Sequence, residues 1–195
     1  MTHLTVANQI TLLRMLLIPA FVLLVVYGEL GWALVVLLAA GLTDALDGLI
    51  ARWRRQKTTL GAWLDPMADK LLLTSAFIVL TVPGTTLTQR IPLWLTVLII
   101  SRDVVIVLTV AIVNLAVGRR TFRPSALGKA ATAIYIVTGL LFMIFNYLER
   151  PSIVLDVSVY ASLVVTVLSS LHYIFHVTRV INAPEPGGPG APAAG

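Results

Sequence analysis

The chain of 195 residues has no cysteine and few charged residues. The missing cysteine excludes a disulfide framework. Charged residues make up 12% of the sequence and hydrophobic residues 58%, whereas a soluble domain carries about 25% charged residues. The composition therefore excludes an ordinary soluble domain and indicates one polytopic domain embedded in a lipid bilayer.

The basic residues give a formal net charge of +5 and lie mainly in short loops between apolar segments. A nucleic-acid-binding protein would instead show a continuous basic face, so no nucleic-acid partner is expected. The two most basic loops, residues 52–57 and 119–123, follow the positive-inside pattern, which places them in the cytoplasm.

Apolar segments separated by these loops predict an all-α integral membrane protein with six transmembrane helices and both ends in the cytoplasm. The predicted helices are residues 8–27, 31–52, 60–82, 91–117, 124–147 and 153–181. Residues 1–182 form one membrane domain, and residues 183–195 are predicted to be a disordered tail rich in Pro, Gly and Ala. The cytoplasmic membrane of a bacterium is favoured over a mitochondrion, because no Arg- and Ser-rich transit segment precedes the first span.

Four of the nine acidic residues lie between residues 44 and 69. Asp44 and Asp47 share one helix face, as do Asp65 and Asp69, and the short basic loop between the pairs makes the two helices antiparallel neighbours. A carboxylate in a membrane helix costs about 2.5–3.5 kcal/mol on insertion scales, so four of them need a compensating partner. Carboxylate oxygens suit hard divalent cations. The sequence therefore predicts a cytoplasm-facing site for one or two Mg²⁺ ions, with Mn²⁺ as an alternative.

The same stretch carries a longer pattern, Asp44-x2-Asp47-Gly48-x2-Ala51-Arg52-x8-Gly61-x3-Asp65-x3-Asp69. This pattern resembles the signature of the class I CDP-alcohol phosphatidyltransferases, and the resemblance extends over residues 5–181. It implies an enzyme of phospholipid biosynthesis that depends on Mg²⁺ and works at the lipid bilayer. The enzyme would transfer the phosphatidyl group of CDP-diacylglycerol to a glycerol hydroxyl, with release of CMP. The resemblance also implies a homodimer.

The resemblance assigns roles to individual residues. The four aspartates would bind the metal, and Asp69 would also act as the catalytic base. The positions expected to contact the CDP moiety are Gly48, Ala51, Arg52, Thr58 and Gly61. The candidate ligands of substrate phosphates are Arg14, Arg102 and Lys129. From the residues alone, alternatives stay open for these three: Arg14 and Lys129 could extend to lipid phosphates, and Arg102 could form a structural ion pair with Asp103.

Residues of the fourth and fifth predicted helices, 91–117 and 124–147, bear on which alcohol is the acceptor. Relatives that use glycerol 3-phosphate tend to carry a second lysine and a glutamine where this chain has Ala131 and Tyr135. One cation fewer suits a phosphodiester better than a phosphomonoester dianion. The stretches Ser101–Asp103 and His172–Tyr173 also resemble cardiolipin synthases. Phosphatidylglycerol is therefore slightly favoured as acceptor, and glycerol 3-phosphate, the acceptor of phosphatidylglycerophosphate synthases, is the alternative.

Two functions from other classes remain open at this point. A cation- or proton-coupled transporter would also place carboxylates inside membrane helices, although near the midplane of the bilayer. A membrane scaffold without catalytic activity predicts that Asp69→Asn leaves the phospholipid composition of a dependent strain unchanged. A transporter would not require the Gly48, Ala51 and Arg52 positions of the pattern.

Overall fold

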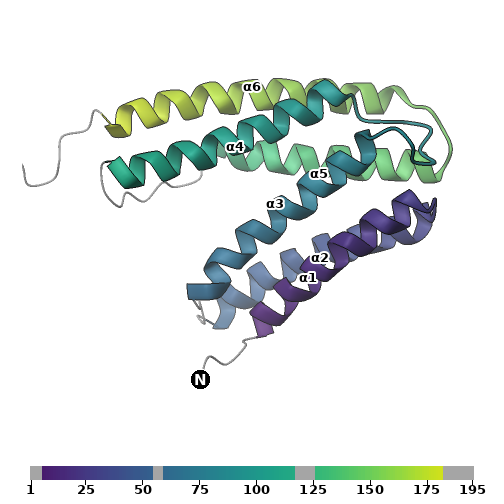
Figure 1. The fold of residues 1–195 in the computed structure, drawn as a ribbon, viewed down its shortest axis with the longest axis horizontal. Helices are drawn as coiled ribbons and strands as arrows, with labels where there is room; N and C mark the ends of the chain where they lie inside the picture. The colour runs from purple at the N-terminus through teal and green to yellow at the C-terminus, as the bar shows by residue number, and fades with distance from the viewer. Residues whose placement is uncertain (1–5, 55–58, 117–125, 182–195) are drawn as a thin grey trace, which may run out of the picture.

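The computed structural model of the protein describes residues 6–54, 59–116 and 126–181. These residues form six α-helices joined by short connections (Figure 1). The helices are α1 (Val6–Val26), α2 (Leu30–Arg54), α3 (Thr59–Thr81), α4 (Leu93–Ala116), α5 (Ala126–Tyr147) and α6 (Ile153–Ile181). The prediction of an all-helical chain is confirmed, and each helix begins and ends within a few residues of its predicted bounds. The predicted tail, residues 183–195, lies outside the described residues.

The helices form two groups that meet at one end of the molecule. Helix α1 packs most extensively against α2 and α3, whereas α6 packs against α5 and α4. In Figure 1 the turn between α1 and α2, the connection between α3 and α4, and the turn between α5 and α6 all lie at the same end. From that end the axes of α3 and α4 diverge. We call the end with these three connections the turn end, and the opposite one the open end.

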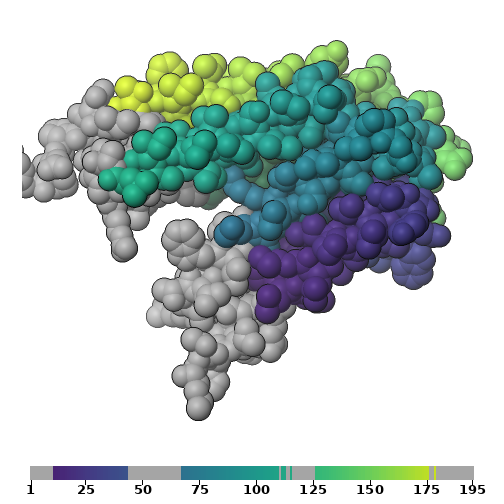
Figure 2. Space-filling model, viewed as in Figure 1, coloured from purple at the N-terminus to yellow at the C-terminus, as the bar shows by residue number. Residues whose placement is uncertain are grey.

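The core extends on both sides of α3, which packs against α1 and α5. Phe21 of α1, Phe77 of α3 and Tyr135 of α5 are fully or almost fully buried. The rings of Phe77 and Tyr135 pack edge to face, with centroids 6.1 Å apart, an arrangement worth about 0.5–1.5 kcal/mol beyond burial. On the face shown in Figure 2, the side chains of α1, α3 and α4 form a continuous surface near the turn end.

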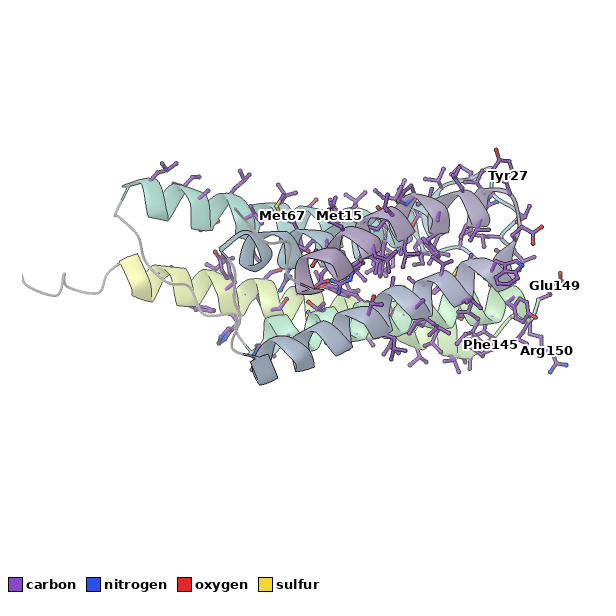
Figure 3. All side chains as sticks on the ribbon, turned by 90° about the horizontal axis from the view of Figure 1, so that it is seen from below. Met15, Tyr27, Met67, Phe145, Glu149 and Arg150 are labelled. Atoms are coloured by element: carbon purple, nitrogen blue, oxygen red, sulfur yellow. The ribbon has the colours of Figure 1, made fainter. Side chains whose placement is uncertain are left out.

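Large apolar side chains cover much of the outside of the bundle. On α4, for example, Val104, Val105, Val107, Leu108 and Ile112 are all exposed, and Figure 3 shows carbon-rich side chains extending from the outer faces of the helices. Monomeric soluble proteins rarely expose continuous apolar surface on this scale. Among the described residues, two helices are long and apolar enough to cross a membrane, Ala126–Tyr147 and Ile153–Phe175. This exposed apolar surface is suited to contact with lipid.

Neutral hydrogen bonds hold the turn end together. Asn146 of α5 accepts a hydrogen bond from the backbone N–H of Gln89 at 2.9 Å and donates to the Gln89 carbonyl at 2.8 Å and to the Phe142 carbonyl at 2.7 Å. The single amide side chain of Asn146 therefore fixes the α3–α4 connection to α5.

The turn after α1 needs a glycine, because Gly28 has φ +82° and an added Cβ would lie 3.1 Å from Oγ1 of Thr86.

Buried hydroxyl groups join α5 to α6. The Tyr135 hydroxyl and Oγ1 of Thr166 are hydrogen-bonded at 2.6 Å, and Oγ1 of Thr138 and Oγ of Ser162 at 2.9 Å. The hydroxyls of Thr138 and Thr166 also donate to carbonyls of α6, those of Ser158 and Ser162 respectively. Each of these hydroxyls has a partner, so the apolar pair of helices carries them without an unsatisfied group.

Candidate functional site

The predicted metal ligands lie on two helices near the open end. Asp44 and Asp47 are in the second half of α2, and Asp65 and Asp69 are in the first half of α3. Helix α1 packs against both of these helices. The side chain of Asp69 is described, whereas those of Asp44, Asp47 and Asp65 lie outside the described part of the structure.

The predicted contacts of the CDP moiety cannot be followed at the level of side chains. Gly48, Ala51 and Arg52 belong to α2, and Gly61 belongs to the first turn of α3, but nothing beyond their backbone is described. Thr58 lies outside the described residues altogether. These five assignments stay predictions.

Two of the predicted site residues form an ion pair across α1 and α3. Nη1 of Arg14 donates a hydrogen bond of 2.5 Å to Oδ1 of Asp69. The Arg14 side chain is only 1% exposed, whereas that of Asp69 is 44% exposed. A guanidinium so buried does not have the arrangement expected of a side chain that extends to lipid phosphates. Arg14 instead offsets one carboxylate charge, and it holds one oxygen of Asp69 while the group stays accessible.

A second charged group links α3 to α4. Nη1 of Arg102 donates to Oδ1 of Asp103 at 2.7 Å, and Nζ of Lys70 lies 3.2 Å from Oδ2 of Asp103. The structural ion pair considered for Arg102 is therefore present. It does not use the whole guanidinium, because Nε of Arg102 is buried and has no hydrogen-bond partner among the described residues. Arg102 thus keeps donor capacity for an anionic group while its side chain is 11% exposed.

The ion pair between Lys70 and Asp103 was not predicted. The two residues are 33 positions apart, and no local pattern in the sequence indicates that they meet. Their charged side chains inside otherwise apolar helices were the only available signal.

Lys129, the third candidate phosphate ligand, lies in the first turn of α5 and is exposed. It makes no ion pair with any residue whose side chain is described. The structure therefore brings Arg14 to Asp69 and Arg102 to Asp103, but it does not bring Lys129 into either group.

The donor chemistry fits a divalent cation. Asp69 gives one oxygen to Arg14, and its exposure leaves the carboxylate accessible to a second partner. Carboxylates on neighbouring helices are the ligands that Mg²⁺ takes up. Among the residues with described side chains, no three His, Cys, Asp or Glu residues come together. Three of the four predicted ligands, Asp44, Asp47 and Asp65, are not among those residues.

Comparison with known proteins decides the family. Residues 4–169 match the family model described as CDP-alcohol phosphatidyltransferase. The chain belongs to the CDP-alcohol phosphatidyltransferase family. The resemblance read from the eight-position pattern is therefore confirmed, and the matched region includes five of the six helices and most of α6.

Relatives of this phosphatidyltransferase carry two kinds of name. A probable phosphatidylglycerophosphate synthase of Mycobacterium tuberculosis is 36% identical over 185 residues, covering 90% of this chain and 82% of the relative. A cardiolipin synthase (CMP-forming) of Streptomyces coelicolor is 36% identical over 138 residues, covering 66% of this chain and 60% of the relative. The human cardiolipin synthase (CMP-forming) is 33% identical over 164 residues, covering 74% of this chain and 53% of the relative.

These findings make the chain a transferase of phospholipid biosynthesis that is associated with membranes. The transporter and the inactive scaffold are no longer needed to explain carboxylates inside apolar helices. Its relatives include both enzyme types considered from the sequence, cardiolipin synthase and phosphatidylglycerophosphate synthase.

Proposed function

We propose that this phosphatidyltransferase transfers the phosphatidyl group of CDP-diacylglycerol to a hydroxyl of phosphatidylglycerol, forming cardiolipin and releasing CMP. The choice of acceptor rests on one observation about α5. Ala131 and Tyr135 stand at the positions where relatives that use glycerol 3-phosphate tend to carry lysine and glutamine. Ala131 is fully buried, and the Tyr135 hydroxyl is hydrogen-bonded to Oγ1 of Thr166. Neither position offers a cation to a phosphomonoester dianion.

Asp69 is the proposed base. The acceptor hydroxyl oxygen attacks the phosphatidyl phosphorus, its proton passes to Asp69, and the bond from that phosphorus to the CMP oxygen breaks. The ion pair with Arg14 supports this role, because it fixes one carboxylate oxygen and leaves the group accessible. A base must lie within hydrogen-bond reach of the proton that it removes, so a fixed orientation favours catalysis.

Asp44, Asp47, Asp65 and Asp69 are proposed to hold Mg²⁺, which Mn²⁺ could replace. Once bound, the cation would stabilise charge on the diphosphate oxygens. We expect chelation with EDTA to stop CMP release and added Mg²⁺ to restore it. We also expect Mg²⁺ to raise the thermal unfolding temperature of the parent protein but not of the Asp44→Asn, Asp65→Asn variant. An unfolding temperature that Mg²⁺ leaves unchanged in the parent would contradict the metal site.

The substrates would be held by groups on several helices. The CDP moiety would contact Gly48, Ala51, Arg52, Thr58 and Gly61. Arg102 and Lys129 would bind the acceptor phosphate, and Arg102 is suited to this because its Nε lacks a partner among the described residues. Binding of both lipids requires that the site open to the bilayer near its cytoplasmic surface.

We further propose that all six helices span the cytoplasmic membrane, that the aspartates face the cytoplasm, and that the enzyme is a homodimer. The basic loops at residues 52–57 and 119–123 support the orientation. With this orientation the nucleotide part of CDP-diacylglycerol reaches the site from the cytosol.

Glycerol 3-phosphate is the second candidate acceptor. It is favoured by the probable phosphatidylglycerophosphate synthase of Mycobacterium tuberculosis, which matches 90% of this chain at 36% identity. The product would then be phosphatidylglycerophosphate.

The test offers both acceptors to the purified enzyme. The protein in detergent is supplied with CDP-diacylglycerol, Mg²⁺ and equal concentrations of phosphatidylglycerol and glycerol 3-phosphate, and the lipid products are identified by mass spectrometry. We expect cardiolipin to predominate. Phosphatidylglycerophosphate as the main product would overturn the proposed acceptor, and no CMP release with either alcohol would overturn the proposed reaction.

A further inference from the structure

Five charged residues of alternating sign run across three helices. In spatial order they are Arg14 of α1, Asp69 and Lys70 of α3, and Asp103 and Arg102 of α4. Three ion pairs connect them, and the backbone joins the consecutive residues Asp69 and Lys70. We call these five residues the charge chain.

The geometry of α3 explains why one helix serves both neighbours. Adjacent residues of an α-helix leave its axis about 100° apart, because there are about 3.6 residues in a turn. Asp69 therefore reaches α1 while Lys70 reaches α4, and both bonds form at one level along α3. The orientation of α3 about its axis is fixed from two sides at the residue proposed as the base.

The link between Lys70 and Asp103 lies well away from the connection between α3 and α4. Near the turn end the two helices are already joined by the hydrogen bond between Thr81 and Thr96, at 2.6 Å. Lys70 precedes Thr81 by 11 residues, which is about 16 Å along a helix. At this distance, where the axes of α3 and α4 diverge (Figure 1), the ion pair holds the two helices together.

We propose that Asp103 is a positioning residue that sets Arg102, the proposed acceptor-phosphate ligand, at a fixed distance from Asp69, the proposed base. The proposal rests on the proposed function of these two residues. Asp103 uses one carboxylate oxygen for Arg102 and the other for Lys70. A movement of α4 relative to α3 therefore breaks the contact with Lys70 or displaces the guanidinium. Because misplacement of a reacting group by about 1 Å can cost roughly 100-fold in rate, this link bears on catalysis.

Kinetics of Lys70 and Asp103 variants test the proposal without removing either proposed functional group. We expect Lys70→Gln to raise the KM for the acceptor about three- to tenfold, and to leave the KM for CDP-diacylglycerol within about twofold. Lys70→Arg keeps a cation and should retain the parental values. Asp103→Asn should raise the acceptor KM more than Lys70→Gln does, because it weakens both ion pairs. The double variant should be no worse than Asp103→Asn alone, since Asp103 is the shared partner.

A distance measurement gives a readout that does not depend on activity. Because the chain has no cysteine, spin labels can be placed at Met67→Cys of α3 and Leu108→Cys of α4, both of which are exposed. We expect the distribution of distances between the labels to broaden in Lys70→Gln and to stay narrow in Lys70→Arg. The control for loss of a single positive charge is Arg150→Gln, because Arg150 is exposed at the turn end (Figure 3). It should match the parent in both measurements.

The outcomes separate this proposal from the proposed function. If the parent protein releases no CMP with any acceptor, the proposed function fails, whereas the spin labels still report on the link between the helices. A broader distribution of label distances together with an unchanged KM for the acceptor would show that the ion pair between Lys70 and Asp103 serves helix packing alone. That result would overturn the positioning role. An equal rise in both KM values, or independent effects of the two substitutions, would overturn it as well.

Discussion

The two ends of the bundle are held together by different chemistry. At the turn end Asn146 joins a connection to a helix through neutral hydrogen bonds with backbone groups. Farther toward the open end, about midway along α3 and α4, ion pairs between side chains join α1 to α3 and α3 to α4. In Figure 3 Met15 and Met67, neighbours of the charge chain, lie at one level along the bundle, far from Glu149 and Arg150 at the turn end.

The difference shows how stability and function are divided in this molecule. Backbone hydrogen bonds at the turn end satisfy polar groups that the connections would otherwise leave unpaired. These ion pairs are a poor source of stability, because the side chains of Asp69 and Lys70 are 44% and 47% exposed, and solvent-exposed ion pairs contribute only about 0–1 kcal/mol. Their presence in apolar helices accords with the roles proposed for Asp69 and Arg102 in the reaction. Substitutions at the two ends should accordingly differ in what they damage.

The largest effect is expected for Asp69→Asn. The amide keeps the shape of the side chain but cannot take up the proton of the acceptor hydroxyl, so we expect CMP release to fall about 10²–10⁴-fold. The measurement is the initial rate with saturating CDP-diacylglycerol, with the thermal unfolding temperature as the check on folding. Retention of more than about a tenth of the parental rate would exclude Asp69 as the base.

Arg14→Gln should damage both activity and stability, and so tests whether the ionic end is functional. Because Asp69 is 44% exposed, loss of the pair costs about 0–1 kcal/mol, and it leaves Asp69 without its fixed orientation. We expect a lower kcat together with a lower unfolding temperature in detergent. Arg14→Lys keeps the charge, and it should recover part of the stability. A variant that is destabilised but has the parental kcat would show that the pair serves packing alone.

Asn146→Ala is the corresponding change at the turn end. It removes the partner of Gln89 and Phe142, so we expect a loss of about 1–3 kcal/mol in the free energy of unfolding. The rate per folded molecule should be unchanged, because the residue lies far from the charge chain. A lower kcat at full folding would contradict the division of roles between the two ends.

The smallest effect is expected for Gly28→Ala, which strains the turn between α1 and α2. A non-glycine residue at φ +82° costs about 1–2 kcal/mol, and the new Cβ crowds Thr86. The second variant, Gly28→Ala with Thr86→Ala, should recover the part of the loss that is due to crowding and keep the part that is due to the backbone. Thermal unfolding of the two variants measures both parts, and equal unfolding temperatures would show that crowding contributes nothing.

The positions of the helices could be read from the sequence, because each apolar segment is long and ends in polar residues. The predicted span 31–52 became α2 (Leu30–Arg54), and 91–117 became α4 (Leu93–Ala116). That all six cross the membrane stays a prediction, although two described helices meet the requirement for crossing by length and apolarity. The family could be read as well, since fixed spacing of aspartates is a local property of the chain.

The contacts between helices could not be read in the same way. Arg14 and Asp69 were both predicted site residues, yet their pairing over 55 positions depends on how α1 and α3 rotate against each other. Lys70 and Asp103 meet for the same reason, and so do Asn146 and Gln89. Such pairings depend on packing of whole helices, which hydrophobic periodicity alone does not determine.

The order of the charge chain along the polypeptide has a consequence for biogenesis. Ribosomes synthesise α1 before α3 and α3 before α4. With these helices spanning the membrane as proposed, Arg14 would already be in the bilayer when Asp69 is inserted, and Lys70 when Asp103 is inserted. Each of these two carboxylates would then meet a cation from an earlier helix, which would lower the free-energy cost of its insertion.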